Sequence, residues 1–366
     1  MLRSGSLTLV RGRIVPLEQI TPRLVDAWAE LATRATEPNP CHEPEFFLSA
    51  VRHLRAPDSL ALAVCGDESR IDACLPVWRG RYWKRLPLQT IRTWQHPYAF
   101  LGAPLLDGAD PAGAGQALIT LLADSHRGDL LVLDDCPVGE GLHSGLAVAA
   151  QRCGTRVHAD RPYQRAAILD TTDAIGLRGK HVKDLRRMRR RLEEKLDARL
   201  TVADLSADTA TVAAFLDLEA SGWKGAGGSA LACAHEAFFR SMCDEAALGE
   251  RIRFLSLQVD GRAVAMLCVL QSGGHRYWFK TAYDERLATY SPGRQLMIEA
   301  TTLLNTPPAS GLVDSCADPD NETINRMWTG RRRLATLLVP LPGRTRSPID
   351  ALAAMSTRRH SSGEAG

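Results

Sequence analysis

The sequence lacks the features that mark disulfide scaffolds, zinc sites and membrane spans. Its nine cysteines are odd in number, none forms a Cys-x-x-Cys pair, and its ten histidines show no metal-binding spacing. We therefore expect reduced thiols in a cytoplasmic protein, and no metal. The longest uninterrupted apolar run covers residues 263–270, whereas a bilayer span needs roughly 20 residues. We expect no signal peptide either, because arginines interrupt the first apolar residues.

Charge of one sign is also lacking, since 45 basic and 42 acidic residues leave a net charge of +3. This balance does not require a nucleic acid partner. The most charged segment, residues 180–195, holds eight Lys or Arg and three acidic residues, with no aromatic residue between them. Base stacking would have no platform there. We interpret the segment as a solvated helix, with contact to RNA as the alternative, and leave the oligomeric state open.

The length of 366 residues and a hydrophobic content of 45% predict two ordinary globular domains. In the second half, the apolar patterns predict the order β-α-α-β-β-β-α-β-α-β, and the first half follows a looser version of it. The fold class is therefore α/β with a mixed sheet. We expect an N-terminal domain over residues 1–170, a basic linker helix over 171–198, a C-terminal domain over 199–343 and a disordered tail over 344–366.

Several motifs, taken together with this order of helices and strands, resemble those of a known protein family. They are residues 215–225 (FLDLEASGWKG), the turn Asp260-Gly261, then Tyr283 and Ser291-Pro292-Gly293, and in the first half residues 94–105. Together they resemble the CelD/BcsL-type acetyltransferases of the GNAT class, which are similar to the FemABX aminoacyltransferases. The resemblance covers roughly residues 40 to 340. It implies two tandem GNAT-like domains and an acyl-CoA co-substrate.

The segment Ser291-Pro292-Gly293-Arg294 has the composition of an anion-binding helix start. Glycine lets a ligand approach the backbone, and the first N–H groups of a helix attract phosphate. Arg286 and Arg294 can add charge-assisted bonds. Only one glycine is present, so a plain helix cap is the alternative. With the resemblance, we expect coenzyme A to contact Phe279, Thr281, Tyr283, Arg286, Ser291, Pro292, Gly293, Arg294 and Gln295.

Catalytic candidates follow this segment. Asp314, on the next predicted strand, could deprotonate an ammonium group, or could only cap the local backbone. Cys316 could accept an acyl group, but no histidine lies near it in sequence to activate it. The resemblance places Asn325 near the thiol of the leaving coenzyme. Trp328 is expected in the core, and the run at residues 331–333 is either a solvated face or a contact for an acidic acceptor.

A glycine-rich loop in the second half could close over an acceptor. Gly225, Gly227 and Gly228 follow Trp223 and Lys224, and such a loop can change its conformation easily. We expect the acceptor to contact Glu219, Trp223 and Lys224.

The sequence thus predicts an acyl-CoA-dependent N-acyltransferase, with acetyl as the expected acyl group. The acceptor would be an amine of a small metabolite or of a sugar or polysaccharide precursor, attacking the thioester directly. One alternative is a FemABX-like transferase that uses aminoacyl-tRNA, and another is a catalytically silent GNAT-like binding module in polysaccharide assembly. The N-terminal domain is expected to have lost the coenzyme site, because residues 110–116 look more like an ordinary helix start than a phosphate loop.

Overall fold

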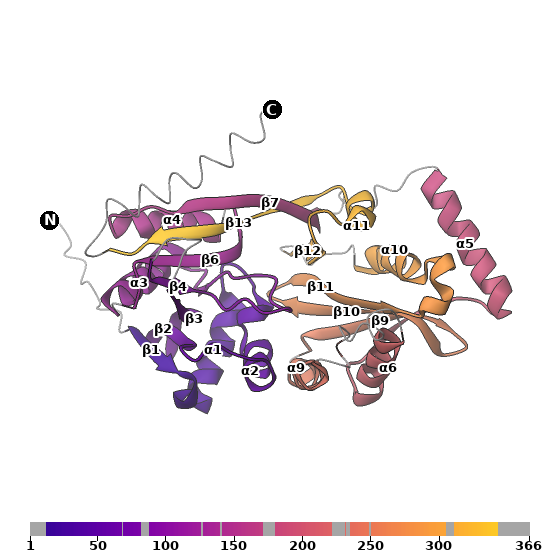
Figure 1. The fold of residues 1–366 in the computed structure, drawn as a ribbon, viewed down its shortest axis with the longest axis horizontal. Helices are drawn as coiled ribbons and strands as arrows, with labels where there is room; N and C mark the ends of the chain where they lie inside the picture. Colours follow the sequence, from indigo (N-terminus) through magenta and orange to yellow (C-terminus); the bar gives the residue numbers. More distant parts are fainter. Residues whose placement is uncertain are drawn as a thin grey trace. The chain divides into compact units, whose positions relative to one another are not determined.

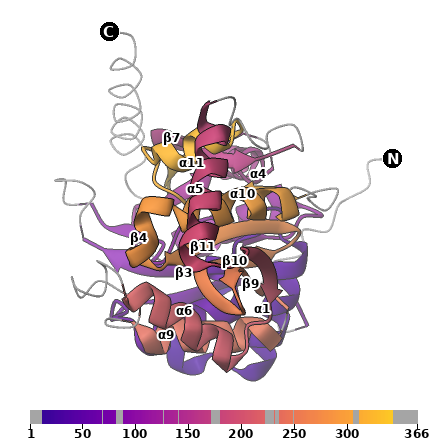
Figure 2. The same ribbon diagram turned by 90° about the vertical axis from the view of Figure 1, so that its right-hand side faces the viewer.

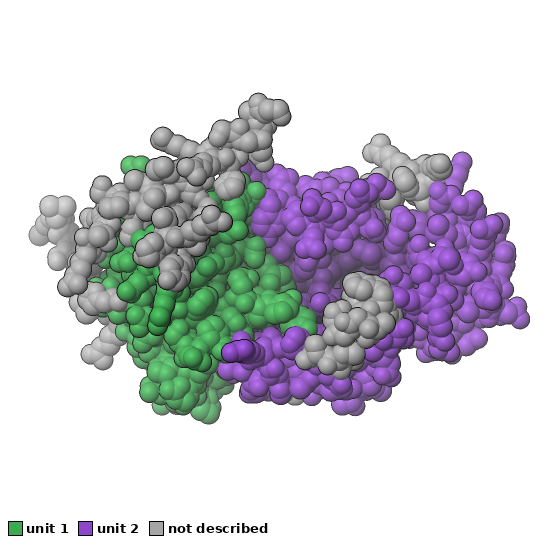
Figure 3. All heavy atoms as spheres, viewed as in Figure 1, with its two compact units in different colours: residues 1–44, 56–162, 334–366 green, residues 45–55, 163–333 purple. Residues whose placement is uncertain are grey.

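A mixed β-sheet with flanking helices is built twice along the chain (Figure 1). The computed structural model describes residues 12–67, 69–81, 88–125, 127–139, 141–170, 180–221, 231, 235–248, 250–304 and 311–342. It divides into two units, coloured in Figure 3. Unit 1 takes residues up to Pro44, Ala56–Pro162 and residues from Leu334 on, and unit 2 takes Glu45–Arg55 and Tyr163–Arg333. The predicted α/β fold with a mixed sheet is confirmed.

Unit 1 holds a sheet in the order β1-β2-β3-β4-β6-β13, with β5 paired to β3. Its strands are β1 (Gly12–Pro16), β2 (Ala61–Asp67), β3 (Arg70–Gly80), β4 (Thr90–Arg92), β5 (Leu105–Leu106), β6 (Leu130–Pro137) and most of β13 (Arg331–Pro340). Its helices are α1 (Pro22–Arg34), α3 (Pro111–Asp124), α4 (Leu142–Arg152) and the short 3-10 helices η1 (Leu17–Gln19) and η2 (Pro40–His42). Apolar residues of α3 and α4 pack on the sheet and form its core.

Unit 2 holds a sheet in the order β7-β12-β11-β10-β9-β8. Its strands are β7 (His158–Ile168, from Tyr163 on), β8 (Thr201–Leu205), β9 (Ile252–Val259), β10 (Arg262–Ser272), β11 (His275–Tyr283) and β12 (Val313–Asp314). Its helices are α2 (Pro44–His53, from Glu45 on), α5 (Lys180–Leu196), α6 (Thr209–Ala220), α9 (Glu236–Leu248), η4 (Glu285–Tyr290), α10 (Pro292–Leu304) and α11 (Glu322–Met327). Helices α6 and α9 cover one face of strands β9–β11, and α10 lies on the other (Figure 1, Figure 2).

Local signals in the sequence account for several of these elements. Asp208 caps α6, because its carboxylate accepts a hydrogen bond from Thr211 N at 2.7 Å. Asp260 and Gly261 both have positive φ angles, of 48° and 77°, and make the tight turn between β9 and β10. Such turns favour Asp-Gly because both central residues need the left-handed region. The predicted meander of three strands is confirmed.

The two sheets repeat one pairing pattern. In unit 1, β3 pairs antiparallel with β4, β4 parallel with β6, and β6 antiparallel with β13. In unit 2, β10 pairs antiparallel with β11, β11 parallel with β12, and β12 antiparallel with β7. The strand that follows α4 in the chain therefore ends in unit 2, and the strand that follows α11 ends in unit 1. The two halves exchange their last strands.

This exchange contradicts what the sequence predicts for the sheet of the C-terminal half. We expect a seven-stranded sheet there, closed by a strand over residues 334–339, but that prediction is wrong. Residues Leu334–Pro340 pair with β6 in unit 1, and six strands of the described residues belong to unit 2. The two closing strands predicted over residues 155–169 are one strand, β7, which unit 2 uses from Tyr163 on. The expected domains are contiguous, whereas the compact units are not.

Helix α2 is a second element that joins unit 2 from the first half of the chain. The ring of Phe46 meets Phe238 and Phe279 edge to face, with centroids 5.5 and 5.8 Å apart. Around this contact, Glu45 pairs with Arg251, and Arg52 with Glu245. The aromatic contacts of Phe46 and these two ion pairs together hold α2 on α9 and β11.

Within the predicted basic linker helix, residues 180–196 form α5, and residues 171–179 lie outside the described part of the chain. Helix α5 is more than a solvated linker. Leu185 and Leu192 are buried in the core of unit 2. Arg189 donates to the carbonyl of Leu200 at 2.8 Å and pairs with Glu299 on α10 at 2.9 Å. One side of α5 is therefore part of unit 2, and the opposite side carries the exposed basic residues.

A fragment cut at the predicted boundaries, residues 199–343, should not fold by itself. It lacks α2, α5 and β7, so β12 loses the strand that flanks it and the core loses Leu185 and Leu192. We expect circular dichroism to show no cooperative thermal transition for the fragment, with the full chain as the control. A single sharp transition in the fragment would contradict the discontinuous units.

Candidate functional site

A gap in the sheet of unit 2 opens between two parallel strands. β11 and β12 pair only at Arg276 with Val313 and at Tyr277 with Asp314. β12 then ends, while β11 continues to Tyr283. The two strands are thus parallel and separate after one short contact. A gap of this kind leaves one edge of β11 available to a ligand over residues 278–283.

A β-bulge lies where the gap begins. The register between β10 and β11 shifts between Cys268 and Val269, so that Trp278 faces Val269, Lys280 faces Cys268, and Phe279 is the extra residue. Bulges redirect backbone groups and are frequent beside active sites. Sequence reasoning missed this feature. No glycine or proline marks it, and only the pairing of two strands defines it.

The N-terminus of α10 lies against the end of β11. A β-carbon added to Gly293 would be 3.2 Å from Cδ1 of Tyr283, so a larger residue would press on that ring. The left-handed residue in this turn is Ser291, with φ of 52°, and not Gly293. The glycine therefore fits the close packing against Tyr283, while the serine provides the turn before Pro292 starts the helix.

Unpaired polar atoms gather in the first turn of α10. Nε of Arg294 is buried and has no hydrogen-bond partner among the described residues. Gln295 donates through Nε2 to the carbonyl of Tyr290 at 2.8 Å, and its Oε1 has no partner there either. Buried polar groups are nearly always paired, so the Arg294 nitrogen at this positive helix end is a candidate contact for an anion.

The other predicted coenzyme contacts are placed differently. Arg286 is exposed and donates to both oxygens of Asp284, at 2.9 and 2.7 Å. These bonds lower the pKa of Asp284, so its charge offsets that of Arg286. Thr281 and Tyr283 lie on β11 opposite Leu267 and Ala265. The structure therefore places the β11 residues along the gap and the α10 residues at its outer end, with Arg286 already paired.

Asp314, the predicted base, lies at the inner end of the gap in a buried ion cluster. Its carboxylate accepts from Arg165 Nη2 at 2.8 Å and from Arg332 Nη1 at 2.6 Å. It also accepts from the backbone N–H of Cys316 at 2.9 Å. Burial alone would raise the pKa of Asp314, but the two arginines outweigh it and lower the pKa to about 2. A carboxylate this acidic is a weak base, so the geometry favours the structural alternative.

The remaining candidates divide into three groups. Asn325 lies on α11 and donates to the carbonyl of Pro319 at 2.6 Å, while its Oδ1 has no partner among the described residues. Glu219 is buried on α6 and accepts from the N–H of Leu231 at 2.7 Å. Trp223 and Lys224 lie outside the described residues, as do Gly225, Gly227 and Gly228. The roles predicted for all of them stay predictions.

Of two further residues in this region, Arg332 differs from what the sequence suggests and Trp328 agrees with it. Arg332 is neither solvated nor placed for an acidic acceptor, because it is 5% exposed and paired with Asp314. Trp328 is in the core, as predicted, and its Nε1 donates to Oγ1 of Thr301 at 3.0 Å. The partner of Arg332 is 18 residues away in sequence, so no local signal could identify it.

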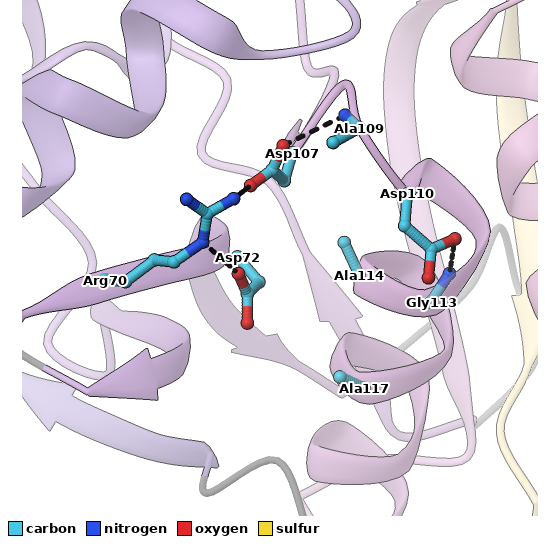
Figure 4. Close-up of a pocket in the computed structure, with 8 residues that line it drawn as sticks. All are labelled: Arg70, Asp72, Asp107, Ala109, Asp110, Gly113, Ala114 and Ala117. Atoms are coloured by element: carbon cyan, nitrogen blue, oxygen red, sulfur yellow. Dashed lines mark hydrogen bonds and ion pairs between the residues drawn. The ribbon is translucent and has the colours of Figure 1, made fainter. Parts of the chain in front are cut away.

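Unit 1 has a pocket of about 230 Å³ at the corresponding helix, α3 (Figure 4). The residues that line it are Arg70, Asp72, Asp107, Ala109, Asp110, Gly113, Ala114 and Ala117. Asp110 caps the helix by accepting from Gly113 N at 2.9 Å, and Asp107 pairs with Arg70 and Arg34. A carboxylate already occupies the positive helix end, so this pocket is unsuited to a pyrophosphate.

Metal and membrane features were sought in the same residues. Within the described ranges, no group of three or more His, Cys, Asp or Glu could hold a metal ion. No helix in those ranges is both long and apolar enough to cross a membrane. The eight described cysteines form no disulfide.

Comparison with known proteins supports the fold read from this geometry. Residues 179–302 match the family described as acetyltransferase (GNAT) domain. FemX resembles the chain with a TM-score of 0.56 at 8% identity, over 93% of this chain and 99% of that one. A conserved protein of unknown function from Bacteroides thetaiotaomicron VPI-5482 gives 0.53 at 14% identity, over 89% and 99%. No curated protein matches the sequence.

A third solved structure is the C-terminal domain of a protein described as a lysylphosphatidylglycerol synthetase, from Agrobacterium fabrum. Its TM-score is 0.51 at 14% identity, over 90% of this chain and 96% of that one. At such identities these likenesses establish the fold alone. The match of residues 179–302 to the GNAT domain agrees with this fold, and the narrower resemblance to the CelD/BcsL family stays a prediction.

Replacing the buried carboxylate should destabilise the protein strongly. Asp314→Asn leaves two buried guanidinium groups without their counter-charge, which costs about 3–5 kcal/mol in the free energy of unfolding. The matched control is Asp204→Asn, which removes an exposed partner of Arg253 and should cost less than about 1 kcal/mol. Urea unfolding measures both. A fully stable Asp314→Asn protein without activity would instead support the general base.

The difference in unfolding free energy between wild type and Asp314→Asn should depend on pH in a definite direction. The pKa of Asp314 is lower in the folded protein, at about 2, than in an unfolded chain, at about 3.9. Its stabilising effect is therefore complete above the unfolded value and is lost as pH falls toward the folded value. The difference in unfolding free energy between wild type and Asp314→Asn should be constant at neutral pH and shrink in acid.

Proposed function

We propose that the protein is an acyl-CoA-dependent N-acyltransferase that transfers an acetyl or related acyl group to an amine. The acceptor would be a small metabolite or a sugar or polysaccharide precursor. The observation that carries the proposal is the gap between β11 and β12 with the N-terminus of α10 at its outer end. An anion held at that helix start would lie in line with the open edge of β11.

The residues at the outer end suit the pyrophosphate of coenzyme A. The backbone N–H groups of Gly293 and Arg294 belong to the first turn of α10 and precede the first bond within the helix, from Gln295 N to Ser291 O. The buried Nε of Arg294 adds a charged donor. Because donors at a helix N-terminus favour phosphate, these groups together would hold a diphosphate.

The residues at the inner end suit the chemistry of acyl transfer. Acyl-CoA supplies the thioester when bound. The backbone at the bulge near Phe279 would polarise the carbonyl, since preorganised N–H donors stabilise developing negative charge. The amine nitrogen forms the new bond to the acyl carbon and the bond to sulfur breaks. The proton that the amine loses passes to a base and finally to the sulfur, so that CoA leaves as the thiol. Asp314 is poorly suited to that role, so Asn325 and a water molecule are the better candidates for guiding the proton.

One observation favours the FemABX-like alternative, in which aminoacyl-tRNA is the donor. The exposed side of α5 carries Lys183, Arg186, Arg191 and Lys195, for which the described part of the chain offers no ion-pair partner. Such a row of cations would attract a polyanion. We rank it second because the helix has no aromatic side chain on which bases could stack.

We place the protein in the cytoplasm, where coenzyme A and charged tRNA are both present. The described cysteines form no disulfide and most are buried. A reducing compartment would keep them in this state.

Ligand-induced stabilisation tests the donor. Acetyl-CoA at about 100 times its dissociation constant should raise the free energy of unfolding by about 2.7 kcal/mol, measured as a thermal shift. Arg294→Gln should weaken binding about tenfold, the effect of one charge-assisted hydrogen bond. Arg286→Gln is the matched control and should change affinity little, because Arg286 is already paired with Asp284. A shift with charged tRNA and none with any acyl-CoA would favour the FemABX-like reading.

The stoichiometry should be one coenzyme per chain. In unit 1 the carboxylate of Asp110 already caps α3, and the pocket beside it is lined by two further aspartates. Titration calorimetry with CoA measures the number of sites directly. Two sites of similar affinity would show that unit 1 has kept coenzyme binding.

A further inference from the structure

Two neighbouring tryptophans in the core of unit 2 differ in the hydrogen bonding of their indole N–H groups. The rings of Trp278 and Trp328 pack edge to face, with centroids 4.6 Å apart. Nε1 of Trp328 donates to Oγ1 of Thr301. Nε1 of Trp278 is buried and has no hydrogen-bond partner in the described part of the chain, although the residue is only 5% exposed. Leaving a buried donor unpaired costs free energy, so the unpaired indole needs an explanation.

The place of Trp278 on β11 suggests one. The last residue of β11 that pairs with β12 is Tyr277, so Trp278 is the first residue beside the gap. It also stands immediately before Phe279, the extra residue of the bulge. Tyr283, which packs on the first turn of α10, is five residues further along the strand, a distance of roughly 17 Å in extended backbone. Trp278 therefore marks the inner end of the gap, and the anion site marks the outer end.

We infer that the indole N–H of Trp278 is the donor that receives the thioester carbonyl oxygen of the acyl-CoA. This inference rests on the proposed function and assigns a binding residue within the same site. An indole nitrogen can donate but not accept, so its ligand must present an acceptor. A carbonyl oxygen meets this requirement, whereas the ammonium group of an amine substrate does not, because it has only hydrogen-bond donors. A pyrophosphate held at α10 leaves the acyl end of an extended arm at the inner end of the gap, beside Trp278.

The paired tryptophans provide the variant and its control. Trp278→Phe removes the N–H and keeps an aromatic ring, and it should weaken acetyl-CoA about fivefold, the effect of one neutral hydrogen bond. CoA lacks the carbonyl, so its affinity should stay unchanged. Trp328→Phe removes a donor that is already satisfied by Thr301, and it should lower the melting temperature while leaving the affinity ratio of the two ligands unchanged. Titration calorimetry with acetyl-CoA and CoA measures these affinities.

A spectroscopic signature separates a ligand contact from a packing role. A hydrogen bond to the thioester lowers the stretching frequency of its carbonyl, which isotope-edited infrared spectra of ¹³C-labelled acetyl-CoA can follow. The band should lie at lower frequency with wild type and Trp328→Phe than with Trp278→Phe. If Trp278→Phe does not fold, replacement of Trp278 by benzothienylalanine, which keeps the shape without the N–H, serves in its place.

The outcomes are distinguishable. If wild-type protein binds neither acetyl-CoA nor CoA, the proposed function fails and the inference fails with it. If wild type binds both, and loss of the indole N–H changes neither the carbonyl band nor the affinity for acetyl-CoA relative to CoA, only the inference is overturned. Equal weakening of both ligands would also overturn it, because the contact would then not be to the thioester.

Discussion

The buried carboxylate of Asp314 is the interaction on which the arrangement around the gap depends. β12 has only two residues and makes only two register pairs with each neighbouring strand. So short a strand cannot be held in position by its ladder alone. Arg165 reaches Asp314 from β7, and Arg332 reaches it from the start of β13. The two ion pairs therefore tie β12 to segments on both sides of it in the sequence, and they do so at the point where β11 and β12 separate.

This cluster also explains why an ionised group is tolerated at that depth. A buried carboxylate is costly unless opposite charge and hydrogen bonds surround it. Asp314 has two guanidinium groups and a backbone N–H, and they lower its pKa despite the burial. The pKa of nearby His275 is lowered as well, but for this group a lower pKa means loss of its charge. Burial, together with Arg332, lowers its pKa to about 4, so it is neutral at pH 7. The inner end of the gap thus carries fixed positive charge that protonation does not alter near neutrality.

Helices α3 and α10 occupy corresponding positions in the repeated topology, but the side chains at their N-termini carry opposite charge. In unit 1 the first turn of α3 is closed by its own aspartate and lies beside a pocket lined by aspartates. In unit 2 the first turn of α10 has a proline, a glycine packed on Tyr283 and an arginine with a buried unpaired nitrogen. The same topology therefore has a carboxylate at one helix start and an arginine at the other, so a few side chains decide the sign of the local charge.

Much of this could be predicted from the sequence. The order of strands and helices, the turn at Asp260-Gly261, the cap at Asp208 and the helix start at Ser291-Pro292-Gly293 follow from local preferences, which depend on residues a few positions apart. The exchange of the last strands could not be predicted, because the apolar pattern of β7 or of β13 is the same whichever of the two sheets the strand joins. Nor could the pairing of Asp314 with Arg165, which are 149 residues apart, the bulge at Phe279, or the unpaired indole of Trp278. Each of these is defined by which distant atoms meet, and only the folded chain decides that.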